Sequence, residues 1–344
     1  MRRSDCSGPG IRRRRQGRGF SYLDPDGGRL TDPAVLERIA ELAIPPAWSD
    51  VWICPYPGGH IQATGTDAAG RKQYLYHPRW RLRRDQQKFD DMLEFARALP
   101  RLRRAVKKDL RRGDLGREHV LACAVRLLDR GFFRIGGEDY AARNDSYGLA
   151  TIQRRHVRAR GVQIAFDYPA KGGRRRRQVV QDPGVSPAIT ALKRRRGGGP
   201  KLLAYRSGRR WVEVRSDDIN DYLKAVTRGD FSAKDFRTWN ATVLAAVALA
   251  VSGAARRSKT ARRRAIVRAT EEVAHYLGNT PAVARASYID PRVFDRFRDG
   301  LTIAPALMPM DVDGDEPAIQ GPVEEAVLDL PAASVPVAWM WPPG

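Results

Sequence analysis

The residues best suited to chemistry lie in three short segments that are widely spaced along the chain. Arg134 stands among apolar residues in the segment 133–136, Arg237 ends the tetrad Lys-Asp-Phe-Arg, and Tyr288 ends the block 280–288. A tyrosine oxygen can attack phosphorus, and arginines can stabilise the negative charge that develops on phosphate oxygens. Such a set could cleave a phosphodiester, provided that another side chain protonates the leaving oxygen.

Motifs for metal-dependent or nucleotide-dependent chemistry are missing from the sequence. It has no Walker A loop, no His-Glu-x-x-His motif and no carboxylate cluster at metal-binding spacing. We therefore expect phosphoryl transfer that relies on cationic side chains, with neither a metal nor a nucleotide cofactor.

Both arginines have neighbours that favour a functional role. Because burying an unpaired arginine is costly, Arg134 needs either a ligand or a structural ion pair with Glu138 or Asp139. Arg237 precedes the run 241–251 of almost pure Ala, Val and Leu, which is typical of a helix buried on all sides. We expect Arg237 at the start of that helix, where helix N-termini attract phosphate.

The block 280–288 predicts a separate helix. Thr280 suits the N-cap and Pro281 the first helical position, which places Tyr288 two turns in, before a stop at Asp290. Without context, a buried helical tyrosine is far more often a hydrogen-bonded core aromatic than a nucleophile. A nucleophilic tyrosine would need nearby cations that favour its phenolate, because its unperturbed pKa is about 10.

The composition favours a nucleic-acid partner. In 344 residues, 62 Lys and Arg stand against 39 Asp and Glu, a formal net charge of +23, which suits a polyanion. On charge alone, an enzyme acting on nucleic acid and a passive ribosome-associated or nucleoid binder are equally consistent, and a protein of acidic membranes is a third alternative. The longest apolar run, 241–251, is well short of the about 20 residues that span a bilayer. Three cysteines without CxxC spacing indicate a reducing compartment, no disulfides and no zinc site.

Changes in composition along the chain predict an α+β protein of two domains with flanking segments. The basic residues 1–18, with the run Arg12 to Arg15, predict a flexible arm. Short apolar runs broken by Gly, Pro and Asp predict a small β-rich domain over 19–85, and apolar residues at helical spacing predict a larger, mainly α-helical domain over 86–308. The acidic, Pro-rich residues 309–344 predict a disordered tail.

Two small β-hairpins are expected within the helical domain, at 162–180 and 202–214. Both have strongly basic loops, as loops facing DNA would have, although solvated basic turns are the alternative. The hairpins and the apolar helix 241–251 are the elements that must position the chemical groups.

Over roughly 20–305, these segments together resemble the type IB DNA topoisomerases. The matching pieces are Gly-His-Ile-Gln-Ala-Thr-Gly at 59–65, Gly-Arg-Lys-Gln-Tyr-Leu-Tyr-His-Pro at 70–78, Arg-Ile-Gly at 134–136, Lys-Asp-Phe-Arg at 234–237 and the Thr-Pro to Tyr block 280–288. The first two resemble the family's DNA-clamping motif and the last three its active-site motifs. The resemblance implies a compact bacterial or poxvirus-like enzyme that nicks one strand through a 3′-phosphotyrosyl intermediate, lets it rotate and reseals it without ATP or metal.

The resemblance also implies a catalytic role for each matching residue. Tyr288 would be the nucleophile, and Arg134 and Arg237 would stabilise the charge of the transition state. Lys171, in the expected hairpin 162–180, would protonate the leaving 5′ oxygen.

Asn279 departs from the poxvirus and nuclear pattern, which has a histidine nine residues before the nucleophile. Its amide can still donate a hydrogen bond to a non-bridging oxygen, so we expect activity without a proton-transfer role at this position. His275, about one turn earlier, is expected on the helix surface.

In the first domain, the resemblance implies contacts to bases and backbone that close a clamp around DNA. We expect these contacts from Gln73, Tyr74, Tyr76 and His77, and further phosphate contacts from Arg71, Lys72, Arg79 and Arg81. An ordinary pair of aromatic strands is the alternative.

Tyrosine recombinases are the nearest rival, because they share the Arg, Lys, Arg and Tyr chemistry. They have His-x-x-Arg where this chain has Lys-Asp-Phe-Arg at 234–237, and they lack the Gln-Tyr-x-Tyr strand of 73–76. A non-enzymatic nucleoid protein would explain the charge but not the two placed arginines. We therefore expect a monomeric enzyme on double-stranded DNA, in the bacterial cytoplasm at the nucleoid, with no membrane partner.

Overall fold

The computed structural model describes residues 1–253, 257–307 and 320–331. The chain divides into two compact units, Met1–Asp90 and Asp91–Gly344. The division falls inside the long helix α2 (Pro78–Leu110). The expected small β-rich and larger helical parts are both present, which confirms the predicted fold class.

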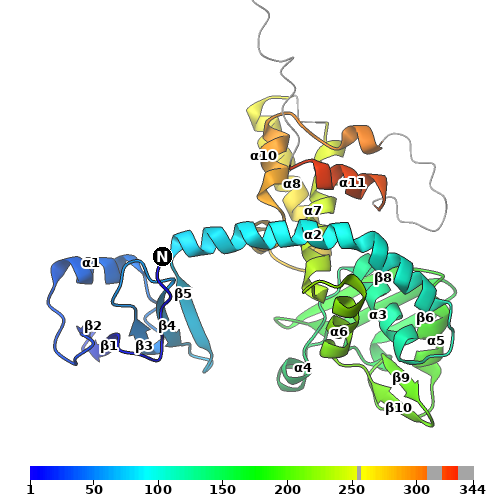
Figure 1. Ribbon diagram of the computed structural model, residues 1–344, viewed down its shortest axis with the longest axis horizontal. Coiled ribbons are helices and arrows are strands. Elements are labelled where there is room, and N and C mark those ends of the chain that lie inside the picture. The colour runs from blue at the N-terminus through cyan, green and yellow to red at the C-terminus, as the bar shows by residue number, and fades with distance from the viewer. Residues whose placement is uncertain (254–256, 308–319, 332–344) are drawn as a thin grey trace, which may run out of the picture. The chain divides into compact units, whose positions relative to one another are not determined.

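The first unit is a five-stranded antiparallel sheet in the order β2-β1-β3-β4-β5, with one helix along its side (Figure 1). Its elements are β1 (Ile11–Gln16), β2 (Gly19–Leu23), α1 (Pro33–Glu41), β3 (Ser49–Ile53), β4 (Ile61–Thr66) and β5 (Lys72–Tyr76). Ile39 of α1 packs with Ile11, Val51, Ile53 and Ala63 in a core. This apolar core fixes which strand residues are left to face outward, because side chains alternate along a strand.

The prediction of a flexible arm over 1–18 is wrong, since Arg12 to Arg15 lie in β1 and pair with β2, and Arg12 also pairs with β3. The hydrogen bonds of a strand ladder come from the backbone, so a run of charged side chains does not prevent them. The guanidinium of Arg13 donates to the carbonyls of Pro45 at 3.1 Å and Trp48 at 2.6 Å. These bonds satisfy a partly buried charge within the sheet.

The second unit is mainly helical, with α3 packed against α6, α7 and strand β8. Its helices after α2 are α3 (Arg117–Gly131), α4 (Glu138–Asn144), α5 (Ser186–Arg194), α6 (Ser216–Thr227), α7 (Ala233–Val251), α8 (Lys259–Leu277), α9 (Pro281–Ser287), α10 (Pro291–Arg298) and α11 (Pro322–Asp329), with 3-10 turns η1 (Arg154–His156) and η2 (Ala304–Leu307). α7 carries the apolar run, but Leu244 and Val247 are only partly buried and Val251 is exposed. The prediction of burial on all sides is therefore wrong for part of the run.

Both predicted hairpins are confirmed. β7 (Gln163–Ala170) and β8 (Arg174–Gln181) pair antiparallel, and β6 (Val157–Arg160) adds a third strand to that sheet. β9 (Ala204–Ser207) and β10 (Arg210–Glu213) form the second hairpin. A basic loop thus joins β7 to β8 beside the helices of the second unit.

The predicted disordered tail is wrong for the part that the structure describes, because residues 322–329 form α11. Glu324 of α11 is buried and accepts bonds from Arg103 of α2 and from the indole Nε1 of Trp239 of α7, at 2.8 Å for the latter. Arg103 also donates to Asp129 of α3 at 2.9 Å. A carboxylate of the acidic segment therefore ties three helices together, whereas its other acidic residues at 311–316 lie outside the described residues.

In the part of the chain that the structure describes, no helix has the length and apolar character needed to cross a membrane.

Candidate active site

Arg134 lies in the loop between α3 and α4, on backbone held by its neighbours. Its carbonyl accepts a 2.8 Å bond from the amide of Leu149. Gly136 has a positive φ of 79° and lies so close to Gly148 that a Cβ added to it would come within 2.6 Å of the Cα of Gly148. Only glycines allow this approach, so the Arg-Ile-Gly spacing positions Arg134.

The alternative ion pair for Arg134 does not form with Glu138. Glu138 instead accepts from Lys201 at 3.3 Å and from the Ser216 amide at 3.0 Å. Arg134 donates to the side-chain oxygen of Asn279.

Arg237 lies in the second turn of α7, slightly further into the helix than expected, and is 4% exposed. Its guanidinium donates to the carbonyls of Phe132 at 2.5 Å and Leu277 at 3.0 Å. Within the described residues its Nε has no hydrogen-bond partner. A buried N–H without an acceptor is rare in proteins, so this group is available for a ligand oxygen.

Tyr288 follows α9, whose predicted start is confirmed: the hydroxyl of Thr280 caps the helix by accepting from the amide of Val283. Tyr288 is not inside the helix as expected but is its C-cap, with φ of −133° and ψ of −26°. Its ring centroid lies 5.2 Å from the guanidinium carbon of Arg237. The structure therefore brings the tyrosine beside one of the two predicted arginines.

The guanidinium groups of Arg237 and Arg134 change the acidity of Tyr288. Burial raises the pKa of Tyr288, but the Arg237 and Arg134 guanidinium groups outweigh it and hold that pKa below its ordinary value. Burial lowers the pKa of Arg237 to about 10, and the charge of Arg134 adds to this effect. The phenolate is thus favoured where a nucleophile needs it.

Asn279 joins the group from the turn after α8. Its amide Nδ2 is buried and has no partner among the described residues, while its oxygen is taken by Arg134. Arg237 and Asn279 therefore each have a buried N–H without a regular hydrogen-bond partner among the described residues, and both side chains interact with the Tyr288 phenol and lower its pKa. His275 is exposed on α8, in agreement with the prediction.

Lys171 lies in the turn between β7 and β8, where Gly172 and Gly173 both have positive φ. It is exposed, and its Nζ lies 5.8 Å from the ring centroid of Tyr140. Lys171 and Arg134 line one cavity of about 510 Å³. The hairpin therefore brings the predicted lysine to the same cavity as Arg134.

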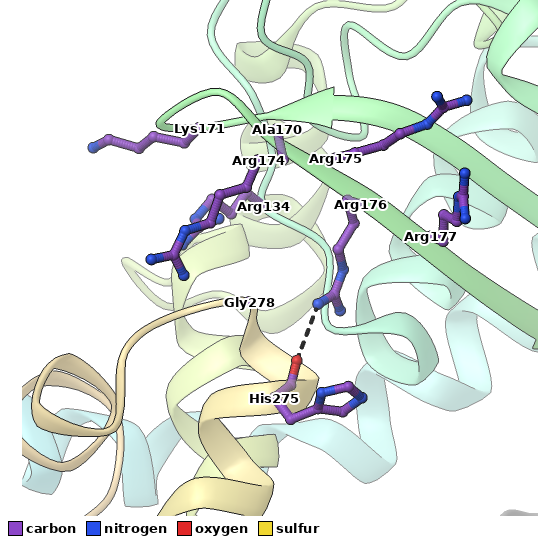
Figure 2. Close-up of a pocket in the computed structure, with 9 residues that line it drawn as sticks. All are labelled: Arg134, Ala170, Lys171, Arg174, Arg175, Arg176, Arg177, His275 and Gly278. Carbon is purple, nitrogen blue, oxygen red and sulfur yellow. Dashed lines mark hydrogen bonds between the residues drawn. The ribbon is translucent and has the colours of Figure 1, made fainter.

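Arg176 is a residue of this cavity that sequence reasoning did not single out. It extends from β8 to the end of α8, where it donates to the carbonyl of His275 at 3.3 Å (Figure 2) and to that of Tyr276. Helix C-termini attract cations, so Arg176 fastens the hairpin to the turn that carries Asn279. The run Arg174 to Arg177 showed only charge, and no pattern distinguished Arg176 within it.

The predicted clamp residues lie on or beside β5 of the first unit. Tyr74 and Tyr76 are 42% and 40% exposed and their rings stack with centroids 6.2 Å apart. Gln73 lies on the other face of the strand, and its amide donates to Asp67 at 2.8 Å. Hydrogen bonds from the backbone and side chain of Arg71 lower the pKa of Asp67 to about 2.

The remaining predicted clamp residues lie before and after Tyr74 and Tyr76 in the sequence. His77 is partly buried and its Nδ1 accepts from the amide of Arg79 at 3.1 Å, while the side chains of Lys72, Arg79 and Arg81 are exposed. Lys72, Tyr74 and Tyr76 thus offer stacking surface and positive charge on the exposed face of β5, and Arg79 and Arg81 add exposed charge at the start of α2. Gln73 is oriented differently from them.

Within the described residues, no group of three or more His, Cys, Asp or Glu is arranged to hold a metal ion. The three cysteines are free thiols.

Two family models and one known protein are similar to this chain. Residues 77–302 match the family model described as eukaryotic DNA topoisomerase I, catalytic core, and residues 19–67 match the model for the bacterial DNA topoisomerase IB N-terminal domain. The chain is 29% identical over 287 residues to the DNA topoisomerase 1B of Acanthamoeba polyphaga mimivirus, covering 81% of this chain and 85% of that protein.

Proposed function

Because the chain belongs to the type IB DNA topoisomerases, we propose that it relaxes supercoiled duplex DNA through a 3′-phosphotyrosyl intermediate, without ATP or metal. The observation that supports this mechanism best is the surroundings of Tyr288. Its ring lies 5.2 Å from the Arg237 guanidinium carbon, and two buried N–H groups, on Arg237 and Asn279, lack partners among the described residues. A phosphate would provide the acceptor oxygens that these groups lack.

The proposed cleavage step exchanges one ester bond for another. The phenolate oxygen of Tyr288 bonds to the scissile phosphorus as the bond from phosphorus to the 5′ oxygen breaks. Arg134, Arg237 and the Asn279 amide bind the non-bridging oxygens, and Lys171 gives a proton to the leaving 5′ oxygen. For Lys171 this requires the hairpin turn to close on bound DNA.

Resealing is the reverse exchange. The 5′-hydroxyl attacks the phosphotyrosyl bond, returns its proton to Lys171 and releases Tyr288. Since the number and kind of ester bonds are unchanged, no ATP is needed. Between the two steps the free strand rotates about the intact one and removes supercoils of either sign.

The exposed face of β5 is the proposed second DNA contact. Tyr74 and Tyr76 would meet bases and backbone, and Lys72, Arg79 and Arg81 would bind phosphates. We further propose that the protein acts as a monomer on bacterial chromosomal DNA.

The test is relaxation of a negatively supercoiled plasmid in EDTA without ATP, by the natural protein, by Tyr288→Phe and by a Tyr205→Phe control on β9. We expect Tyr288→Phe alone to lose relaxation while binding duplex DNA within a few-fold of the natural protein. Relaxation by Tyr288→Phe would contradict the proposal. A need for paired sites, with recombinant products, would favour a tyrosine recombinase instead.

A further inference from the structure

The position of Tyr288 is only partly set by the helix that precedes it. As the C-cap of α9, it keeps one helical bond, from its amide to the Ala284 carbonyl at 3.0 Å, but its own dihedral angles are not helical. α9 is short and largely exposed, with Ala284 as its buried residue. The orientation of the phenol therefore depends on contacts made by the backbone of residues 288–290.

The Ile289 amide donates to the Ala284 carbonyl at 3.2 Å, and two other contacts of this backbone are made to a single hydroxyl. Thr242 of α7 is 1% exposed, and its Oγ1 lies 3.3 Å from the Tyr288 carbonyl oxygen and 3.2 Å from the Asp290 amide nitrogen. The same hydroxyl lies 2.9 Å from the Thr238 carbonyl of its own helix. One side chain of α7 thus accepts from the segment after Tyr288 and can donate to the carbonyl of Tyr288 itself.

Asp290 shows that this segment is fixed on its other side as well. Its carboxylate is 1% exposed, caps α10 by accepting from the amide of Arg292 at 2.9 Å and pairs with the Arg292 guanidinium at 2.7 Å. The backbone between Tyr288 and Asp290 is therefore held between α10 and the hydroxyl of Thr242.

Arg237 lies on the same helix as Thr242, five positions earlier. α7 fixes the backbone spacing of the two residues, and the bonds from Arg237 to the Phe132 and Leu277 carbonyls hold its guanidinium in place. We propose that Thr242 is a positioning residue that holds Tyr288 at reacting distance from Arg237. The inference rests on the proposed function, since it assigns a task to Thr242 in the same tyrosyl transfer.

The test is the rate of single-turnover cleavage of a nicked duplex by Thr242→Val, which keeps the side-chain shape and removes the hydroxyl. A misplacement of about 1 Å can lower a rate by on the order of 100-fold, so we expect a loss of about 10- to 100-fold, with duplex affinity within about two-fold. The pH at half-maximal rate should rise, because a phenol further from Arg237 loses the charge that lowers its pKa.

Matched variants separate positioning from packing. Thr242→Ser keeps the hydroxyl and should restore both rate and pH profile. Thr270→Val of α8 removes a buried hydroxyl that bonds to the Ile266 carbonyl at 2.7 Å of its own helix, and should cleave normally. If the valine variant is unfolded at the assay temperature, Thr242→Ala and Thr242→Ser give the same comparison, since both are smaller than threonine.

Cleavage by Thr242→Val at the natural rate with an unchanged pH profile would overturn the inference. So would a slow variant that serine does not restore, because this would indicate a packing defect. Failure of the natural protein to form a tyrosyl adduct would instead overturn the proposed function, and the inference with it.

Discussion

Replacing Arg237 separates the contribution of its positive charge from that of its guanidinium geometry. Arg237→Lys keeps a positive charge but replaces a planar fork by a single ammonium group. In the protein the fork bonds to the carbonyls of Phe132 and Leu277 at 2.5 and 3.0 Å and leaves Nε unpaired. One ammonium on a flexible stem cannot keep both carbonyl bonds and also present a donor in the place of Nε.

The expected size of the effect follows from the number of donors lost. Removing one preorganised donor from a developing oxyanion costs about 2.7–4 kcal/mol, or about 10²–10³ in rate. We therefore expect Arg237→Lys to lower the single-turnover cleavage rate by about 10²–10³. Arg237→Gln should lose at least as much, because it also removes the charge.

The pH dependence distinguishes the two variants. The charge of Arg237 lowers the pKa of Tyr288, so the rate of the natural protein should rise with pH at a lower pH than for an ordinary phenol. Arg237→Gln should shift this rise to higher pH, whereas Arg237→Lys, which keeps a charge, should shift it less.

The assay is cleavage of a nicked duplex over a range of pH, with Arg298→Lys as the control. Arg298 is exposed on α10 and pairs with Asp295 at 2.6 Å. Cleavage by Arg237→Lys within a few-fold of the natural rate would refute the reasoning, since the fork would then have no special task.

Two further predictions concern the C-terminal helix and the first unit. Glu324→Ala removes the carboxylate that bonds to Arg103 and Trp239; breaking a buried pair costs about 3–5 kcal/mol, so thermal melting should drop clearly, whereas the exposed Glu325→Ala should melt normally. An unchanged melting temperature for Glu324→Ala would show that α11 does not stabilise the unit. Tyr74→Ala with Tyr76→Ala should weaken duplex binding without changing the slope of log affinity against log salt, because no phosphate contact is lost. Unchanged affinity would exclude the two rings as a contact.

The sequence predicted elements whose signals are local. The start of α9 followed from Thr280 and Pro281, and the β7–β8 hairpin from a basic turn between two strand patterns. The approach of Tyr288 to Arg237 was predicted only through the resemblance, because it depends on contacts between segments about fifty residues apart.

The errors at residues 1–18 and in the acidic C-terminal segment came from the assumption that charged side chains are solvated. Arg13 lies in β1, where carbonyl oxygens satisfy its guanidinium, and Glu324 in α11 is buried against Arg103. Composition alone does not reveal a partner that is distant in the chain. For the same reason, the sequence did not predict the roles of Thr242 and Arg176, which contact backbone atoms of other elements.

The most direct test of the account is mass spectrometry of the protein trapped on a nicked duplex and digested with protease and nuclease. We predict a nucleotide joined through its 3′-phosphate to the peptide that contains Tyr288. A nucleotide on any other residue, or cleavage without a covalent adduct, would contradict the central claim that this phenol attacks phosphorus beside Arg237.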